Sequence, residues 1–349
     1  MPIPLLPRHV VVICALTVAC SSATGPDDER PAPEDHATPV ALDVLGRDTY
    51  LGFEGGLYLD GSNTMPPDHR AEALRRLALV RPRDASGAPS AAGRIVLLSV
   101  GYSNASQEFC AVAEYTTCTA WSFMGQAAAA PDVNHASVTI VNGARGGQTS
   151  VHWDAPDDPN YERIRVEGLA PLGLSEAQVQ IVWIKVATSY PTTSLPAADA
   201  DAYALLEDWG EILRTLRIRY PNLQLVFAST RTYGGFATVE LSPEPFAFET
   251  GFAVKWAIEA QIRQNRSVTT PSGPAGDLRY DRTPWLGWGP YLWALGQPDP
   301  LTAWTRTDFI ADGVHPSRAG QEKVVAMLLA FFRTSELAQC WFLAERSCA

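Results

Sequence analysis

The chain has 349 residues, with 38 Asp and Glu against 27 Lys and Arg, so its formal net charge at pH 7 is −11. Such an acidic chain offers no basic stripe to displace counterions from a nucleic-acid backbone, so we expect no nucleic-acid partner. The length is sufficient for one large α/β domain or two smaller ones.

The N-terminus has the features of an export signal. Residues 9–19 form an apolar segment between Arg8 and Cys20 that is too short to cross a bilayer. Residues 16–20, Leu-Thr-Val-Ala-Cys, resemble a bacterial lipobox, in which the cysteine is lipidated and becomes the mature N-terminus. We therefore expect a signal over residues 1–20, lipidation at Cys20, and an exported protein of the cell envelope that meets the membrane only through this anchor. Ordinary secretion with cleavage nearby is the alternative.

The next segment, residues 21–41, is rich in Pro, Asp, Glu, Ser, Ala and Thr and contains almost no large apolar side chains. This composition predicts a disordered tether. Residues 42–349 follow without an internal repeat or a convincing second domain, so we expect a single domain there.

Four of the six cysteines lie beyond the signal. They form two local pairs of equal spacing, Cys110 with Cys118 and Cys340 with Cys348. Neither pair has the two-residue gap typical of zinc knuckles. Two disulfides are the simpler interpretation, and disulfides fit an oxidising compartment.

Short continuous apolar runs alternate with helical patterns along the domain. The runs predict strands buried on both faces at residues 94–100, 137–141, 178–186 and 223–228. Helical spacing predicts helices at residues 70–80, 200–220 and 249–265, and a last helix that begins near Ser317. This alternation implies an α/β fold with a central parallel sheet, whose functional loops gather at the carboxyl ends of the strands.

A serine follows the first predicted strand, in the stretch Gly101-Tyr102-Ser103-Asn104. A serine on a strand-to-helix turn is presented at the sheet edge with its hydroxyl exposed and its own N–H free to point at a substrate oxygen. The plainer alternative is that Ser103 or Ser106 caps the helix that follows.

A glycine pair, Gly146-Gly147, follows the second predicted strand. Glycine there lets the backbone approach a tetrahedral intermediate closely and donate an N–H to its oxyanion. A glycine pair is also common in plain turns, so this signal is weak by itself.

Near the C-terminus, Asp312 stands three residues ahead of His315 on a turn that contains Gly313. Such a carboxylate can reach back to the imidazole Nδ1, fix its tautomer and stabilise the imidazolium that forms when Nε2 takes a proton. Pro316 biases His315 away from helical backbone. The alternative is a helix start that happens to contain a histidine, with Ser317 as its N-cap.

The order of these motifs over residues 94–334 resembles the SGNH, or GDSL, hydrolase family. The resemblance implies a three-layer α/β/α, flavodoxin-like fold with Ser103 as nucleophile, His315 as base and Asp312 as its orienting group. It further implies that the N–H groups of Ser103 and Gly147 form the oxyanion hole, and that no metal or organic cofactor is needed.

Two positions depart from the family pattern. Tyr102 replaces the acidic residue of the first block, Gly-Asp-Ser, and the strand at 178–186 runs on into Ala187-Thr188 without the family's asparagine. Losing that donor without replacement lowers the rate on the order of 10²-fold or more. The candidate replacements are Thr188, Lys185 and Asn104, although Lys185 also suits an ion pair at the strand end.

Aromatic residues crowd the region from 285 to 304, with Trp285 and Trp288 foremost. Exposed rings beside a catalytic site suit the apolar faces of sugars, and the polar partners expected with them are Gln148, Arg231 and Tyr233. The alternative is that the rings are packing.

Together these features predict a serine esterase that hydrolyses acetyl or similar esters, with acetylated polysaccharide as the expected substrate and a lipid ester as the other option. The competing hypothesis is a carbohydrate-binding lipoprotein on an SGNH-like scaffold that has lost catalysis.

Overall fold

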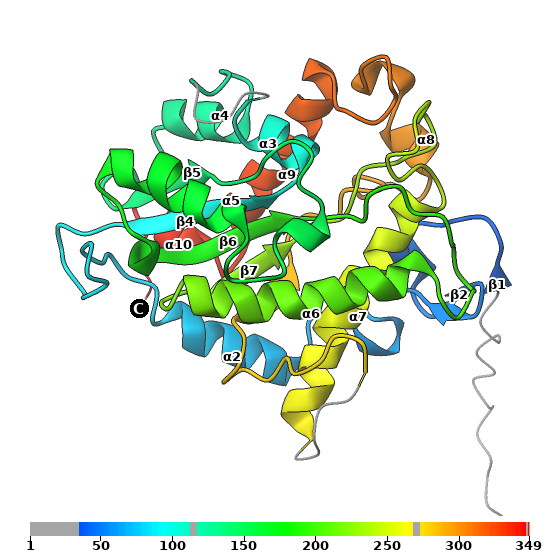
Figure 1. Ribbon diagram of the computed structural model, residues 1–349, viewed down its shortest axis with the longest axis horizontal. Coiled ribbons are helices and arrows are strands. Elements are labelled where there is room, and N and C mark those ends of the chain that lie inside the picture. Colours follow the sequence, from blue (N-terminus) through cyan, green and yellow to red (C-terminus); the bar gives the residue numbers. More distant parts are fainter. Residues whose placement is uncertain (1–34, 112–116, 268–272, 347, 349) are drawn as a thin grey trace, which may run out of the picture. The chain divides into compact units, whose positions relative to one another are not determined.

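The computed structural model describes residues 35–111, 117–267, 273–346 and 348, and within them five parallel strands form a central sheet (Figure 1). The strands are β4 (Ile95–Gly101), β5 (Val138–Asn142), β6 (Val179–Lys185), β7 (Leu225–Ala228) and β8 (Trp285–Trp288). Their order across the sheet is β5-β4-β6-β7-β8. The first strand of this sheet therefore lies between the second and the third, which is the flavodoxin-like order, and the expected α/β fold is confirmed.

The four predicted strands correspond to β4, β5, β6 and β7, with ends that differ by at most two residues. The fifth strand, β8, escaped prediction because its sequence is only Trp-Leu-Gly-Trp, a short aromatic stretch between prolines. Every residue of β4, β6, β7 and β8 is buried, which explains why these strands carry no alternating polar pattern.

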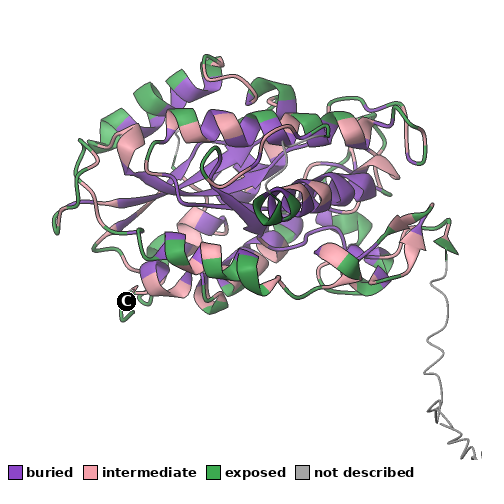
Figure 2. Ribbon diagram, turned by 90° about the horizontal axis from the view of Figure 1, so that it is seen from below, coloured by how far each residue is buried: buried purple, intermediate pink, exposed green. Residues whose placement is uncertain are grey.

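Helices cover both faces of the sheet. Side chains from α6 (Asp201–Arg219) and α7 (Phe246–Arg266) pack with Val96, Leu98 and Val100 of β4. The other face, which includes Ile95 and Leu97, packs against α2 (Pro67–Leu77), α3 (Ser103–Phe109), α4 (Phe123–Ala129), α9 (Arg318–Thr334) and α10 (Gln339–Phe342). Figure 2 shows the buried strands between these layers, with the exposed sides of the helices turned outward.

Smaller elements complete the described chain. They are α1 (Leu42–Leu45), α5 (Pro159–Arg163), which continues as a π-helix over Ile164–Leu169, and α8 (Pro300–Ala303). A three-stranded sheet of β1 (Asp35–His36), β2 (Thr49–Tyr50) and β3 (Phe53–Glu54) is formed by the residues on either side of α1. None of the described helices is long and apolar enough to span a membrane.

The predicted signal, Cys20 and most of the predicted tether lie outside the described residues. The end of the tether, however, is part of the fold: β1 pairs in parallel with β2, and Ala41 is fully buried. The predicted start of the domain at residue 42 is therefore too late. The polar composition of the preceding residues gave no sign of a short strand or of a buried alanine.

Both predicted disulfides are present. Cys110 pairs with Cys118 just after α3, and Cys340 in α10 pairs with Cys348 near the end of the chain. The bonds join residues close in sequence, so they brace local segments rather than the sheet itself.

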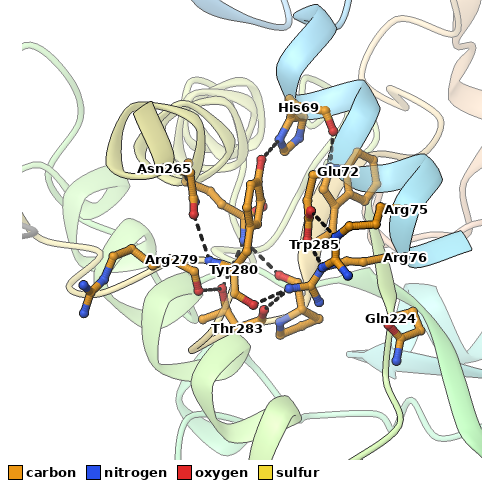
Figure 3. Close-up of polar contacts among 12 residues, drawn as sticks. His69, Glu72, Arg75, Arg76, Gln224, Asn265, Arg279, Tyr280, Thr283 and Trp285 are labelled. Atoms are coloured by element: carbon orange, nitrogen blue, oxygen red, sulfur yellow. Dashed lines mark hydrogen bonds and ion pairs between the residues drawn. The ribbon is translucent and has the colours of Figure 1, made fainter. Parts of the chain in front are cut away.

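Helix α2 is anchored to the segment that leads into β8 through His69 (Figure 3). One ring nitrogen, Nε2, lies 2.9 Å from the carbonyl oxygen of Leu286, which can only accept, so Nε2 carries the proton. The other, Nδ1, then accepts from the hydroxyl of Tyr280 at 2.6 Å. The neutral ring therefore makes both hydrogen bonds. Burial lowers the pKa of His69 to about 4.

This predicts a pH-dependent stability that His69→Gln removes. Between the ordinary histidine pKa of 6.5 and the folded value of about 4, the unfolded chain binds the proton and the folded chain does not. The free energy of unfolding should therefore fall by roughly 3 kcal/mol as the pH is lowered through this window. Urea unfolding of the wild type and the variant at several pH values measures the difference. His135→Gln, at an exposed histidine, is the control, and equal pH slopes in the wild type and His69→Gln would contradict the account.

Candidate active site

A pocket of about 460 Å³ opens where the carboxyl ends of the strands meet. Loops from five parts of the chain line it: Tyr102, Ser103 and Asn104 after β4; Gly146, Gly147 and Thr149 after β5; Ala187, Thr188, Ser189 and Tyr190 after β6; Arg231, Leu241 and Ser242 after β7; Val314 and His315 before α9. The strand order brings these loops together, because β4 lies between β5 and β6 at the point where the chain changes direction across the sheet.

Ser103 is the first residue of α3 and follows β4 after a single linking residue, Tyr102. Strand β4 ends at Gly101, where a Cβ atom would lie 2.1 Å from the carbonyl oxygen of Lys185, so no other residue fits this close approach to β6. The N–H of Ser103 has no acceptor within the helix, since it belongs to the first turn. Both the hydroxyl and the N–H of Ser103 therefore stand at the pocket.

His315 and Asp312 form a continuous hydrogen-bond chain with Ser103. The Ser103 Oγ lies 2.8 Å from His315 Nε2, and His315 Nδ1 lies 2.6 Å from Asp312 Oδ2. Because a carboxylate only accepts, Nδ1 carries the proton, and Nε2 is left to accept from the serine hydroxyl. This is the tautomer that a general base requires.

The Asp312 carboxylate is held by its own loop. Its other oxygen accepts from the N–H groups of Val314 at 2.9 Å and His315 at 3.0 Å. Burial raises the pKa of Asp312, but these two N–H groups and the His315 side chain outweigh burial, so the pKa lies below its ordinary value. Gly313 has φ +70° and its missing Cβ would meet the carbonyl of Phe236 at 1.7 Å, so the turn depends on glycine.

Asn104 connects the serine helix to the histidine loop. Its amide nitrogen donates to the carbonyl oxygen of Val314 at 3.0 Å, in a buried position. Ser103 directly precedes Asn104 and His315 directly follows Val314, so this bond helps to fix the distance between Ser103 and His315. Asn104 was a candidate oxyanion donor; the structure places it at the pocket, with its amide engaged in positioning this loop.

The oxyanion candidates Gly147 and Thr188 both line the pocket. Gly147 has φ +75°, and a Cβ there would meet nothing within 4 Å, so the loop is open on that side. Thr188 follows β6, and its Oγ1 is buried without a protein partner. Its carbonyl accepts from the Ser242 hydroxyl at 2.9 Å, which fixes the residue at the pocket wall.

Lys185 is not at the pocket. Its side chain is 0% exposed, and Nζ lies 2.7 Å and 2.8 Å from the two carboxylate oxygens of Glu108. Burial raises the pKa of Glu108 and lowers the pKa of Lys185, while their attraction opposes both shifts. The ion-pair alternative is therefore the right one, and the prediction of Lys185 as an oxyanion donor is wrong. Glu108 lies 77 residues from Lys185 in the chain, so the sequence around Lys185 gave no indication of this ion pair.

The prediction of Trp285 and Trp288 as a sugar platform is also wrong. The two rings are 0% and 6% exposed, and their indole N–H groups donate to the carbonyls of His69 and Leu57. Trp285 stacks on His69 with ring centroids 4.8 Å apart (Figure 3). It is the first residue of β8, so it lies at the amino end of the strand, whereas the pocket lies at the carboxyl ends. The rings of this region are buried because they form β8 and the core around it.

Two of the three polar partners expected with that platform also lie away from the pocket wall. The side-chain oxygen of Gln148 accepts from Asn160 at 2.8 Å. Tyr233 packs edge to face on Trp293, with centroids 5.8 Å apart. Arg231 is the one that lines the pocket, together with Leu241 and Ser242, which the sequence reading missed because they arrive from a long loop without regular pattern.

Among the described residues, no group of three or more His, Cys, Asp or Glu side chains is arranged to hold a metal ion.

Comparison with protein families finds no matching family model, and no curated protein matches the chain. Solved structures with a similar fold include a GDSL-like lipase from Parabacteroides merdae, at 13% identity and a TM-score of 0.41, covering 72% of this chain and 97% of that one. An extracellular lipase from Streptomyces rimosus has 15% identity and a TM-score of 0.34, with 68% and 99% coverage. A family two carbohydrate esterase from Cellvibrio japonicus has 12% identity and a TM-score of 0.35, with 70% and 62% coverage. Similarity this low says nothing about what the chain acts on.

The buried ion pair generates a prediction. Lys185→Met leaves the Glu108 carboxylate buried and unpaired, and should lower the free energy of unfolding by roughly 3–5 kcal/mol. The double variant Glu108→Gln with Lys185→Met removes both charges and should recover most of that loss. Urea unfolding measures both, and Arg165→Met, at an exposed pair with Glu162, is the control that should change little. Wild-type stability in Lys185→Met with loss of a pocket activity would instead place Lys185 in the site.

Proposed function

We propose that this chain is a serine esterase of the SGNH type, which removes acyl groups, acetyl groups first among them, from carbohydrate esters through an acyl-enzyme. The observation that carries this proposal is the unbroken chain from Ser103 Oγ through the His315 ring to Asp312, with bonds of 2.8 Å and 2.6 Å at a pocket wall. A serine hydroxyl bonded in this way has a base in place to take its proton.

In the proposed mechanism, Ser103 Oγ attacks the ester carbonyl carbon while its proton passes to His315 Nε2. Asp312 holds the ring and stabilises the imidazolium. The same proton then goes to the departing alkoxide, and the acyl group remains on Ser103. A water molecule gives a proton to His315 Nε2 as it attacks this second ester. His315 then returns the proton to Ser103 Oγ as the bond to the acyl carbon breaks, which releases the carboxylic acid and the free serine.

The tetrahedral intermediate needs donors for its oxyanion. The N–H groups of Ser103 and Gly147 are two candidates at the pocket, and we assign the third place to the hydroxyl of Thr188. Thr188 belongs to the pocket wall and follows β6, where the SGNH pattern has its asparagine, and its hydroxyl oxygen is buried without a partner among the described residues. The bond from the Ser242 hydroxyl fixes the Thr188 carbonyl and hence its main chain, and a rotation of the side chain would turn the hydroxyl toward the oxyanion.

The pocket wall combines hydroxyl groups with apolar surface. Seven lining residues carry a hydroxyl group: five are aliphatic, in Ser103, Thr149, Thr188, Ser189 and Ser242, and two are the phenols of Tyr102 and Tyr190. Large aliphatic side chains are few there, namely Leu241 and Val314. A volume of about 460 Å³ suits a small acyl group with part of a sugar.

The competing hypothesis is a carbohydrate-binding protein on the same scaffold without catalysis. Tyr102 and the missing asparagine are the features that favour it. Such a protein would bind its ligand in the same pocket but would transfer no proton at Ser103. Binding and turnover therefore separate the two.

Replacement of the nucleophile tests the proposal. Ser103→Ala should lower kcat for a short acetyl ester by about 10⁴-fold or more, because the acyl-enzyme cannot form. Ser86→Ala, at an exposed serine remote from the pocket residues in the sequence, is the control and should hydrolyse like the wild type. Turnover that survives Ser103→Ala unchanged contradicts the esterase. Glycan binding without turnover in the wild type supports the binding protein.

Replacement of Thr188 tests the oxyanion assignment. Thr188→Val keeps the shape of the side chain and removes its hydroxyl, so kcat should fall on the order of 10²-fold with little change in KM. Thr188→Ser restores the hydroxyl and should recover most of the rate. Equal rates for the valine and serine variants would exclude a role for this hydroxyl.

A further inference from the structure

Arg231 is a buried residue at the pocket whose Nε has no hydrogen-bond partner among the described residues. The residue is 4% exposed, and its Nε is buried without a hydrogen-bond partner. Its backbone N–H donates to the Thr250 hydroxyl at 3.2 Å, which fixes the main chain just after β7. The guanidinium nevertheless belongs to the wall of the pocket that contains Ser103.

The nearby buried carboxylates are engaged elsewhere. Glu108 is paired with Lys185. Glu244 accepts from the Gly234 N–H at 2.8 Å, from the Trp293 indole at 2.7 Å and from the Phe248 N–H at 3.1 Å. Arg231 lowers the pKa of both glutamates against the larger effect of burial, so it acts on them through space without bonding to either.

Tyr102 is a further neighbour of Arg231. The guanidinium carbon lies 5.4 Å from the centre of the Tyr102 ring, and the phenol oxygen is itself buried without a hydrogen-bond partner. Burial raises the pKa of Tyr102 far above its usual range, and the positive charge of Arg231 beside the phenol opposes this shift. An acidic residue at position 102, as in the SGNH pattern, would place a carboxylate beside this guanidinium. Tyrosine instead places the face of its ring beside the guanidinium and offers no carboxylate.

The buried Nε–H of Arg231 is costly unless something accepts from it, because this donor has lost water and gained no acceptor among the described residues. The planar fork of N–H groups matches the two oxygens of a carboxylate, and such charge-assisted pairs are stronger than neutral hydrogen bonds. The pocket side of Arg231 is the side from which a ligand can supply them.

We propose that Arg231 binds a carboxylate on the substrate, so that the preferred esters carry an acid group beside the scissile bond, as an O-acetylated uronic acid does. The inference rests on the proposed esterase and names its substrate class. A singly charged carboxylate fits better than a phosphate dianion, because the single positive charge of buried Arg231 balances one negative charge and would leave the second without a partner.

The test compares two esters that differ only in the acid group: the acetyl ester of a methyl glucuronoside and that of the matching methyl glucoside. Wild-type kcat/KM should be about tenfold or more higher for the uronate, mostly through KM. Arg231→Gln should bring the ratio of the two kcat/KM values close to one, and Arg231→Lys should leave an intermediate ratio. Arg282→Gln, at an exposed arginine, is the control and should keep the wild-type ratio.

Each outcome decides a separate point. Equal wild-type kcat/KM for the two esters, or a ratio that Arg231→Gln leaves intact, overturns the carboxylate site. Absence of turnover on both esters overturns the proposed esterase. Calorimetry with Ser103→Ala then still tests whether Arg231 binds a carboxylate, because equal affinities for free glucuronate and glucose refute that binding.

If Arg231→Gln fails to fold, inhibition of the wild type decides. Glucuronate should inhibit more strongly than glucose or inorganic phosphate, and the reverse order contradicts the proposal.

Discussion

The site depends on strands that are buried on both faces and run parallel. Parallel strands need crossover helices on both sides of the sheet, and their carboxyl ends then lie along one edge. In the order β5-β4-β6-β7-β8, the loops after β4, β5, β6 and β7 all reach one pocket, and the segment before α9 completes it. Residues more than 200 positions apart in the chain, Ser103 and His315, meet there for this reason.

Within that frame, close backbone approaches fix the catalytic geometry. Gly101 lies against β6 and Gly313 against the Phe236 carbonyl, and neither position has room for a Cβ atom. Asn104 then joins the serine helix to the histidine loop through the Val314 carbonyl. The Asp312 carboxylate receives two backbone N–H groups besides the imidazole. The hydrogen-bond chain is therefore held by the main chain on both sides, as preorganised catalysis requires.

The parts of the structure that the sequence predicted are those with strong local patterns. Strands β4 to β7 are apolar runs bounded by turn residues, and the Asp312 to His315 spacing is itself a short-range geometric relation. The failures concern residues whose partners lie far away in the chain. Lys185 pairs with Glu108, and Trp285 bonds to the backbone of His69, which no local reading can find. An aromatic cluster is compatible with either a platform or a core, and only the position of β8 in the sheet decides between them.

The two departures from the SGNH pattern are connected through the pocket. Thr188 offers a hydroxyl where the pattern has an amide, and Tyr102 supports Arg231 where the pattern has an acid. In our proposals, Thr188 performs the same task as the asparagine that it replaces, whereas Tyr102 beside Arg231 serves a different choice of substrate.

The central claim is that Ser103 is an activated nucleophile. Its most direct test is to treat the protein with a fluorophosphonate and map the modified peptide by mass spectrometry, with His315→Ala treated in parallel. The account predicts a single adduct on Ser103 that forms far more slowly in the variant. An unmodified Ser103, or labelling at the same rate without His315, would contradict it.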